Sequence, residues 1–187
     1  MEDIRQLMNM DFNRLPAQEF ARDMFLFSFY TRGMSFVDMA FLRKEDLKDG
    51  DLVYKRRKTG RQLVVKWESC MQHIVDKYVM EGSPYLLPVI NVNSAEDERE
   101  QYLRTAHNIN RRLKKIGQEM RLQFPLTMYV ARHSWASIAR DKQIPVSVIS
   151  QCMGHESEKT TRIYLASLNT DVLDHANHSV LEDLFSD

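Results

Sequence analysis

Cysteine, glycine and proline are scarce in this chain of 187 residues. The two cysteines, Cys70 and Cys152, form no Cys-x-x-Cys pair, so nothing indicates a disulfide framework or a thiol redox motif. We expect a reducing, cytoplasmic setting in which both are small buried or half-buried side chains. Because six glycines and five prolines stand against many Leu, Met, Arg, Lys and Glu residues, the composition favours helices.

Long apolar runs are also missing. No stretch approaches the roughly 20 apolar residues of a membrane-spanning helix. Residues 1–12 contain no basic region followed by an apolar stretch, which argues against a secretory signal. Hydrophobic residues still make up 43% of the chain and charged residues 28%, enough for a packed core rather than disorder. We expect one domain, or a large domain with a short appendage, and no membrane partner.

The formal net charge is zero, which by itself does not favour a nucleic-acid partner. The charges are segregated, however, with acidic residues gathered at 95–100 and after residue 171. Such segregation can give a neutral protein one strongly positive face. Helix faces of mixed charge are the alternative, but they explain the basic run at 55–58 less well. The basic groups are Arg43, Lys44 and Lys48; residues 55–58 with Arg61 and Lys66; and Arg104, Arg111, Arg112, Lys114 and Lys115.

Hydrophobic periodicity predicts a mainly α domain with a small antiparallel sheet, an α+β architecture. Residues 45–67 change to period two and predict two strands joined by a tight turn at 58–60. Ser35 and Asp38 form a predicted capping box, and Ser94 is a second predicted helix cap. Residues 2–10 have an amphipathic pattern. The predicted helices cover residues 17–30, 35–42, 68–80, 95–120, 128–140, 145–153, 159–166 and 170–185.

Candidate catalytic side chains are concentrated in two segments, residues 127–137 (TMYVARHSWAS) and 153–168 (MGHESEKTTRIYLASL). They place an arginine, two histidines and a tyrosine on neighbouring predicted helices. His133, Cys152 and His155 have no zinc-ligand spacing and lack a fourth ligand. The combination suits phosphate chemistry at a tyrosine oxygen, with no metal and no cofactor.

The second segment resembles the catalytic domain of tyrosine recombinases, the phage-integrase type of site-specific DNA recombinase. The family pattern is Leu-Gly-His with a tyrosine nine residues after the histidine, and Gly154, His155 and Tyr164 fit it. The resemblance extends over nearly the whole chain. It implies a catalytic domain at 1–168, a C-terminal tail helix at 169–187, and an N-terminal core-binding domain that is absent from this chain.

Two further motifs carry the resemblance. Arg132 and His133 fit the family's His-x-x-Arg-His box, in which Tyr129 takes the place of the first histidine. Lys58, in the Lys-Thr-Gly of the predicted hairpin, matches the family's catalytic lysine. The resemblance therefore implies an enzyme that cleaves and rejoins DNA through a 3′-phosphotyrosine. It is similar to mobile-element integrases, while a resolver or an invertase would use the same chemistry.

The chemistry assigns a role to each matched side chain. Tyr164 attacks the phosphorus, and Arg132 stabilises the charge that develops on the phosphate oxygens. Lys58 is the candidate general acid for the departing 5′-oxygen. His155 donates to the phosphate or handles the tyrosine proton. Tyr129 can donate one hydrogen bond but cannot act as a base near neutral pH.

The family's first arginine has no direct match. It normally stands in Gly-x-Arg-x-x-Glu, where this chain has Gly33 to Asp38, so that Ser35 falls on the arginine position. Arg32 and Arg22 are the nearby alternatives. We expect Arg32 to reach the site from the turn, as the partner of Arg132.

Double-stranded DNA and a second copy of the chain are the expected partners. The resemblance implies a tetramer on DNA in which C-terminal segments are exchanged, while packing of the tail on its own domain is the alternative. Basic side chains of the hairpin and of helix 95–120 are expected to contact the DNA backbone. These candidates are Arg56, Arg57, Arg111, Arg112, Lys114 and Lys115.

Each matched residue also has a structural interpretation. Tyr164 fits a core aromatic position, His155 a helix C-cap, and Arg132 a buried ion-pair partner. Lys58 fits a charge that protects the hairpin edge. Ser35 and Tyr129 leave open a second class of function, a DNA-binding protein that keeps the recombinase fold with a decayed active site.

Overall fold

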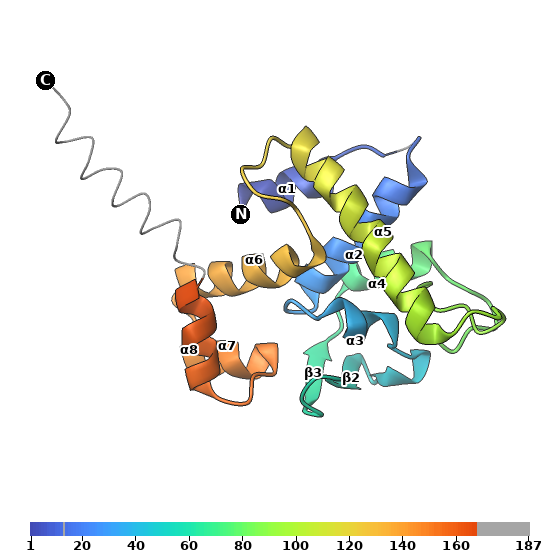
Figure 1. The fold of residues 1–187 in the computed structure, drawn as a ribbon. Coiled ribbons are helices and arrows are strands. Elements are labelled where there is room, and N and C mark those ends of the chain that lie inside the picture. The colour runs from blue at the N-terminus through green and yellow to red at the C-terminus, as the bar shows by residue number, and fades with distance from the viewer. Residues whose placement is uncertain (13, 168–187) are drawn as a thin grey trace, which may run out of the picture.

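The computed structural model describes residues 1–12 and 14–167, which form a mainly helical domain with a small antiparallel sheet (Figure 1). The predicted fold class is confirmed. No helix in these residues is long and apolar enough to cross a membrane. The elements in chain order are α1 Glu2–Asn9, α2 Pro16–Tyr30, α3 Phe36–Ala40, a 3₁₀ turn Lys44–Asp46, β1 Leu47–Lys48, β2 Asp51–Lys55, β3 Gln62–Lys66, α4 Ser69–Lys77, α5 Glu98–Glu119, α6 Met128–Asp141, α7 Val146–Met153 and α8 Glu158–Ser167.

The sheet has the order β1-β2-β3, and all of its pairs are antiparallel. In the predicted hairpin, Leu52 pairs with Val65 and Tyr54 with Leu63, so that these four side chains share the buried face. The sequence prediction missed β1, which contributes only two residues. Its connection to β2 contains Asp49-Gly50, with φ of 52° and 77°, a tight turn of the kind that favours hairpins.

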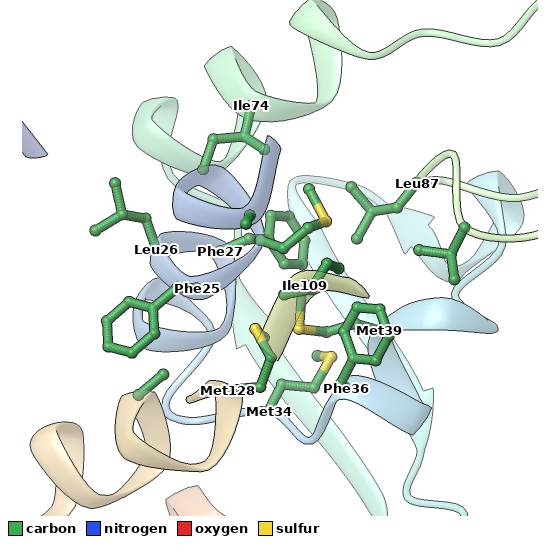
Figure 2. Packing of buried hydrophobic residues seen from close by; sticks show 14 of the residues in the cluster. Phe25, Leu26, Phe27, Met34, Phe36, Met39, Ile74, Leu87, Ile109 and Met128 are labelled. Atoms are coloured by element: carbon green, nitrogen blue, oxygen red, sulfur yellow. The ribbon is translucent and has the colours of Figure 1, made fainter. Parts of the chain in front are cut away.

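The main core surrounds α2, whose side chains Met24, Phe25 and Phe27 are fully buried. Helix α5 crosses the same core, and Figure 2 shows methionines from three parts of the chain close to its Ile109. Methionine fills such irregular spaces well because its side chain is unbranched and flexible. The three labelled methionines are Met34, Met39 and Met128.

A second, smaller cluster holds the C-terminal helices together. It joins Ala136 and Ala139 of α6 to Ile149 and Met153 of α7 and to Leu165 of α8. In Figure 1 the short helices α7 and α8 lie at one end of α6, apart from the main core. The described chain therefore has a main body and a helical satellite, with α6 belonging to both.

Most predicted helices are present, with some shifted ends. Helix α5 begins at Glu98, and its cap is Asp97, whose side chain accepts from the amide of Arg99 at 2.9 Å. The predicted cap was wrong: the Ser94 hydroxyl accepts from Glu96 at 3.1 Å in a turn before the helix. The Ser35 cap is confirmed by a bond from the amide of Asp38 at 3.4 Å. The predicted tail helix lies outside the described residues.

Candidate active site

A cleft of about 540 Å³ opens between hairpin β2–β3, α3, α5, α6 and the turn from α7 to α8. Most of the predicted catalytic side chains line it, and Lys58 of the hairpin is about 70 residues or more from the others in the sequence. Ser35 and Arg56 line the same space, and Arg32 does not. The predicted catalytic residues in the lining are Lys58, Tyr129, Arg132, His155 and Tyr164.

Arg132 is fixed in the wall of the cleft by three contacts. It stands on α6 and is only 7% exposed. Its Nη1 donates to the carbonyl of Gly33 at 2.8 Å, and its Nη2 donates to the carbonyl of Met153 at 2.8 Å. The same Nη2 lies 3.0 Å from Nε2 of His155. This arginine therefore connects the α2–α3 turn with the end of α7, and the same contacts hold its guanidinium in place.

The approach of the α2–α3 turn to α6 requires glycine at position 33. Gly33 has φ of +74°, a left-handed conformation that side chains disfavour. A Cβ placed there would lie 2.7 Å from Cα of Arg132, closer than packed atoms can approach. The missing side chain at Gly33 thus allows the carbonyl to reach the Arg132 guanidinium.

His155 has a defined tautomer in this arrangement. Arginine only donates hydrogen bonds, so Nε2 of His155 must accept from Arg132, and the ring proton must sit on Nδ1. Nδ1 lies 2.8 Å from Oγ1 of Thr161, which is fully buried on α8 and accepts that proton. Burial first, and then the positive charges of Arg132, Arg56 and Lys58, lower the pKa of His155 to about 4. The imidazole is therefore neutral at physiological pH.

Aromatic rings surround Tyr164 on α8. The His133 ring stacks on it at 5.2 Å between centroids and 7° between planes, and the His155 ring meets it edge-on at 5.5 Å. Tyr129, which is 59% exposed, packs edge-on against His133 at 4.2 Å. The Tyr164 hydroxyl oxygen is shielded from solvent. The ring is thus held in place, with its oxygen covered.

The surroundings of the Tyr164 phenol shift its pKa in opposite directions. Burial raises its pKa above the ordinary value, and the Tyr129 side chain adds to that effect. The positive charges of Arg132 and Arg56 act the other way and favour the phenolate. Because burial dominates, the pKa stays above the ordinary value and the phenol is protonated near neutral pH.

Two arginines of hairpin β2–β3 hold the turn that carries His155. Nη1 of Arg56 donates to the carbonyl of Gly154 at 2.8 Å, and Nη1 of Arg61 donates to the carbonyl of His155 at 2.6 Å. Lys58, at the exposed tip of the same hairpin, lines the cleft. The hairpin that carries the predicted general acid therefore also holds the backbone of the predicted histidine in place.

The candidates for the first arginine lie in different places. Arg32 has φ of 63°, and its Nη1 donates to the carbonyl of Val64 at 3.1 Å on the exposed side of the sheet. Arg22 binds the carboxylate of Asp23 at 2.7 Å, away from the cleft lining. Ser35 lines the cleft, where its hydroxyl donates to the Asp38 carboxylate at 2.6 Å. None of these three side chains presents a guanidinium to the cleft.

The predicted DNA contacts divide into three groups. Arg56 is buried in the cleft wall rather than displayed on the surface. Arg57 is exposed on the hairpin, and its guanidinium lies 4.1 Å from the centroid of the Phe41 ring. The four basic side chains of α5 are exposed or half-buried, whereas Ile109, Leu113 and Ile116 of the same helix are buried. These four are Arg111, Arg112, Lys114 and Lys115.

Sequence reasoning missed two parts of the site. Thr161, the partner of His155, was not singled out, although it lies three residues before Tyr164 and so shares a helix face with it. The inward position of Arg56 was also readable, because alternation from Leu52 and Tyr54 places residue 56 on the buried face. The contacts from the two hairpin arginines to the turn at 154–155 join segments too distant for any local pattern to predict.

Comparison with known proteins gives one family. The family model described as phage integrase family matches residues 1–170. Over 168 residues the chain is 23% identical to the tyrosine recombinase XerA of Pyrococcus furiosus, covering 87% of this chain and 54% of that protein. The chain thus spans about half the length of this curated relative.

Solved recombinase structures share the fold. The XerH site-specific recombinase bound to a difH substrate in a pre-cleavage complex aligns with a TM-score of 0.62 and 16% identity, over 86% of this chain and 46% of that one. A lambda integrase (75–356) dimer bound to a COC′ core site aligns with a TM-score of 0.59 and 16% identity, over 87% and 57%. At these identities the similarity concerns the fold.

Proposed function

The chain belongs to the phage integrase family, and from that membership we propose that it is the catalytic domain of a site-specific DNA recombinase. In this proposal it cuts and rejoins double-stranded DNA through a 3′-phosphotyrosine. The observation that carries the proposal is the shared cleft: a tyrosine, an arginine, a histidine and a lysine from separate elements face one space. Family matches in sequence and in fold support the same function.

Each side chain then has a step. The Tyr164 oxygen attacks the phosphorus, the bond from phosphorus to the 5′-oxygen breaks, and the 5′-oxygen takes a proton from Lys58. Arg132 donates to the non-bridging oxygens, where negative charge grows in the transition state. The neutral imidazole of His155 can accept the phenolic proton. Tyr129 adds a hydrogen bond to the phosphate. The products are a DNA 3′-phosphotyrosine and a free 5′-hydroxyl, and the reverse steps rejoin the strand.

The covered Tyr164 oxygen makes a conformational step part of this proposal. Attack on phosphorus requires the oxygen to come within bonding reach of a phosphate in the cleft. Tyr164 lies on the satellite formed by α7 and α8, which the main body contacts through Arg56, Arg61 and Arg132. We infer that DNA binding moves this satellite relative to the hairpin and uncovers the phenol.

The larger assembly is proposed from the family. The exposed basic side chains of α5, with Arg57, would contact the DNA backbone, and several copies would assemble on one site. The tail at 169–187, which lies outside the described residues, would dock on a neighbouring protomer. An apolar groove of about 410 Å³ between α1, α6 and residues 122–126 offers a surface for such a segment. An integrase of a mobile element is the proposed biological setting.

The test uses a nicked duplex that traps the covalent intermediate, because the short 5′-end diffuses away after cleavage. The full-length protein is incubated in EDTA with a duplex selected by binding from a randomised pool. We expect a covalent protein–DNA band that Tyr164→Phe abolishes while DNA binding persists. An equal band from Tyr164→Phe would contradict the assignment of the nucleophile.

One specific observation favours a second function. Ser35 occupies the family's arginine position, and in this structure its hydroxyl is occupied as the cap of α3. If the site has decayed, the protein would bind its DNA without any adduct. Binding in the same assay at full occupancy, with no covalent band from the unmodified protein, would establish this alternative.

A further inference from the structure

Arg56 enters the cleft because of its position in the sheet. Strand β2 buries alternate side chains, Leu52 and Tyr54, and Arg56 continues that inward row one residue beyond the strand end. Its side chain is 9% exposed and lines the cleft beside Arg132. Within the described chain the one hydrogen bond of its side chain runs from Nη1 to the carbonyl of Gly154, at 2.8 Å. Nε and Nη2 are left to serve a ligand.

Among the residues that the structure describes, neither guanidinium group has a counter-ion. In residues 1–12 and 14–167 no carboxylate lies within 4.0 Å of the charged nitrogens of Arg56 or Arg132. The carboxylate of Asp38, which stands on α3, accepts from the Ser35 hydroxyl and from the backbone amide of Arg57 instead. Buried charges are normally paired, because removing them from water is unfavourable. A site with two such cations is completed by an anion from outside.

The two cations also act on each other. Burial lowers the pKa of the Arg132 guanidinium, and the positive charge of Arg56 lowers it further. That repulsion is unfavourable in the free protein and is relieved when an anion binds between the groups. Arginine suits such an anion because its planar fork matches the oxygens of a phosphate.

We propose that Arg56 supplies the second guanidinium of the phosphate site, in place of the arginine that is missing at position 35. The inference rests on the proposed function and deepens it. Arg32, the alternative from the sequence, donates to the carbonyl of Val64 outside the cleft. Arg56 then acts twice: Nη1 holds the turn before His155, while Nε and Nη2 donate to a non-bridging oxygen of the scissile phosphate.

A neutral phosphate analogue separates these two roles. In a methylphosphonate, one charged non-bridging oxygen of the scissile group is replaced by a methyl group, so that less negative charge needs stabilising. We measure the rate of covalent adduct formation on matched phosphate and methylphosphonate duplexes. Arg56→Ala should lose about 100-fold or more in rate on the phosphate, the effect of removing one preorganised donor. On the methylphosphonate we expect it to remain within about tenfold of the unmodified protein.

Arg61→Ala is the matched control. It removes another hairpin arginine that holds the same turn, through the carbonyl of His155, but does not line the cleft. We expect this variant to lose the same factor on both substrates, since it disturbs only position. If Arg56→Ala does not fold, Arg56→Lys, which keeps a positive charge, takes its place. Its rate should fall more on the phosphate than on the methylphosphonate, as for Arg56→Ala, but by a smaller factor.

The outcomes distinguish this inference from the function it rests on. If the unmodified protein forms no adduct on the phosphate duplex, the proposed function fails first. If it does form the adduct and Arg56→Ala loses equally on both substrates, only the role of Arg56 is overturned. Rescue of Arg32→Ala by the methylphosphonate, in place of Arg56→Ala, would assign the second guanidinium to Arg32.

Discussion

His155 is held as a neutral ring by its neighbours on both sides. Its Nε2 accepts from Arg132 and its Nδ1 donates to Thr161. In this state the ring cannot donate from Nε2 to a phosphate. When a phosphate draws the Arg132 guanidinium away, the ring can adopt its other tautomer, with the ring proton on Nε2. The Thr161 hydroxyl can then rotate and donate to Nδ1. Thr161 is therefore a positioning residue for His155.

The stability of the protein should depend on the His155 ring below neutral pH. Its pKa is about 4 in the fold against 6.5 for a free side chain, so the unfolded chain binds the extra proton between these values. The free energy of unfolding is fully supported above about pH 6.5 and falls as the pH drops toward 4, by about 2 kcal/mol between pH 7 and pH 5. Urea denaturation at a series of pH values measures this slope.

His155→Gln should flatten that slope, because the titrating ring is gone. His107→Gln, which changes an exposed histidine on α5, should keep the slope of the unmodified protein. Identical pH slopes for the His155 variant and the unmodified protein would show that the buried ring does not titrate as described.

Substitution of Thr161 tests the hydrogen bond to His155. Thr161→Val keeps the shape but leaves the buried Nδ1–H without its acceptor at 2.8 Å, which should cost about 1–3 kcal/mol in the free energy of unfolding at pH 7. Thr161→Ser restores the hydroxyl and should recover most of that loss. Equal stability of the valine variant and the unmodified protein would argue against this bond.

At the scale of elements, the close contact of the α2–α3 turn with α6 depends on Gly33. Gly33→Ala should destabilise the protein through two effects, the left-handed backbone and the collision with Cα of Arg132. Gly60→Ala is the matched control, since it has φ of +68° with no atom within 4 Å of the added Cβ. We expect Gly33→Ala to lower the free energy of unfolding by about 2 kcal/mol more than Gly60→Ala does. Equal losses in thermal or urea denaturation would contradict the proposed contact.

Helix α5 should contribute to DNA affinity through its exposed basic side chains. Each phosphate contact adds about 0.9 to the slope of log affinity against log salt concentration. Lys114→Gln with Lys115→Gln should therefore lower that slope by up to about 2. Arg104→Gln, on the same helix but bound to Glu96 at 2.7 Å, should change it little. The slope is measured by fluorescence anisotropy from low to moderate salt, and an unchanged slope in the double variant would place DNA on another face.

Local patterns predicted most elements because each carries its own signal. The alternation in β2 and β3 and the Ser35 cap were sufficient for those elements. Strand β1 was missed because two residues give no period. The start of α5 was misplaced because Ser94, Asp97 and two further acidic residues offer competing caps, and only the three-dimensional contacts choose among them.

At the scale of the whole molecule, the described chain consists of a main body and a satellite of α7 and α8 that share α6. The cleft lies where they meet, with Lys58 and Arg56 on one side and His155 and Tyr164 on the other. The candidate catalytic side chains are thus divided between the main body and the satellite. Under the proposed function, movement of the satellite against the main body would change the distance from the phenol to a bound phosphate, and cleavage would then wait until DNA is in place.

Motif spacing predicted which residues gather at the cleft but not how each is held there. Tyr164, His155 and Arg132 could be predicted as site residues because their spacing within two short segments is specific. The buried position of Arg56 and the outward position of Arg32 depend on how the hairpin packs against the turn at 154–155. That packing joins residues nearly 100 positions apart, so no local rule contains it.

Peptide mapping of the covalent adduct tests the central claim most directly. The trapped protein–DNA complex is digested with nuclease and protease, and mass spectrometry locates the residue that still carries the nucleotide. We predict a nucleotide 3′-phosphate on the Tyr164 oxygen. A nucleotide found on Tyr129 or on any other side chain, in protein that forms the adduct, would contradict it.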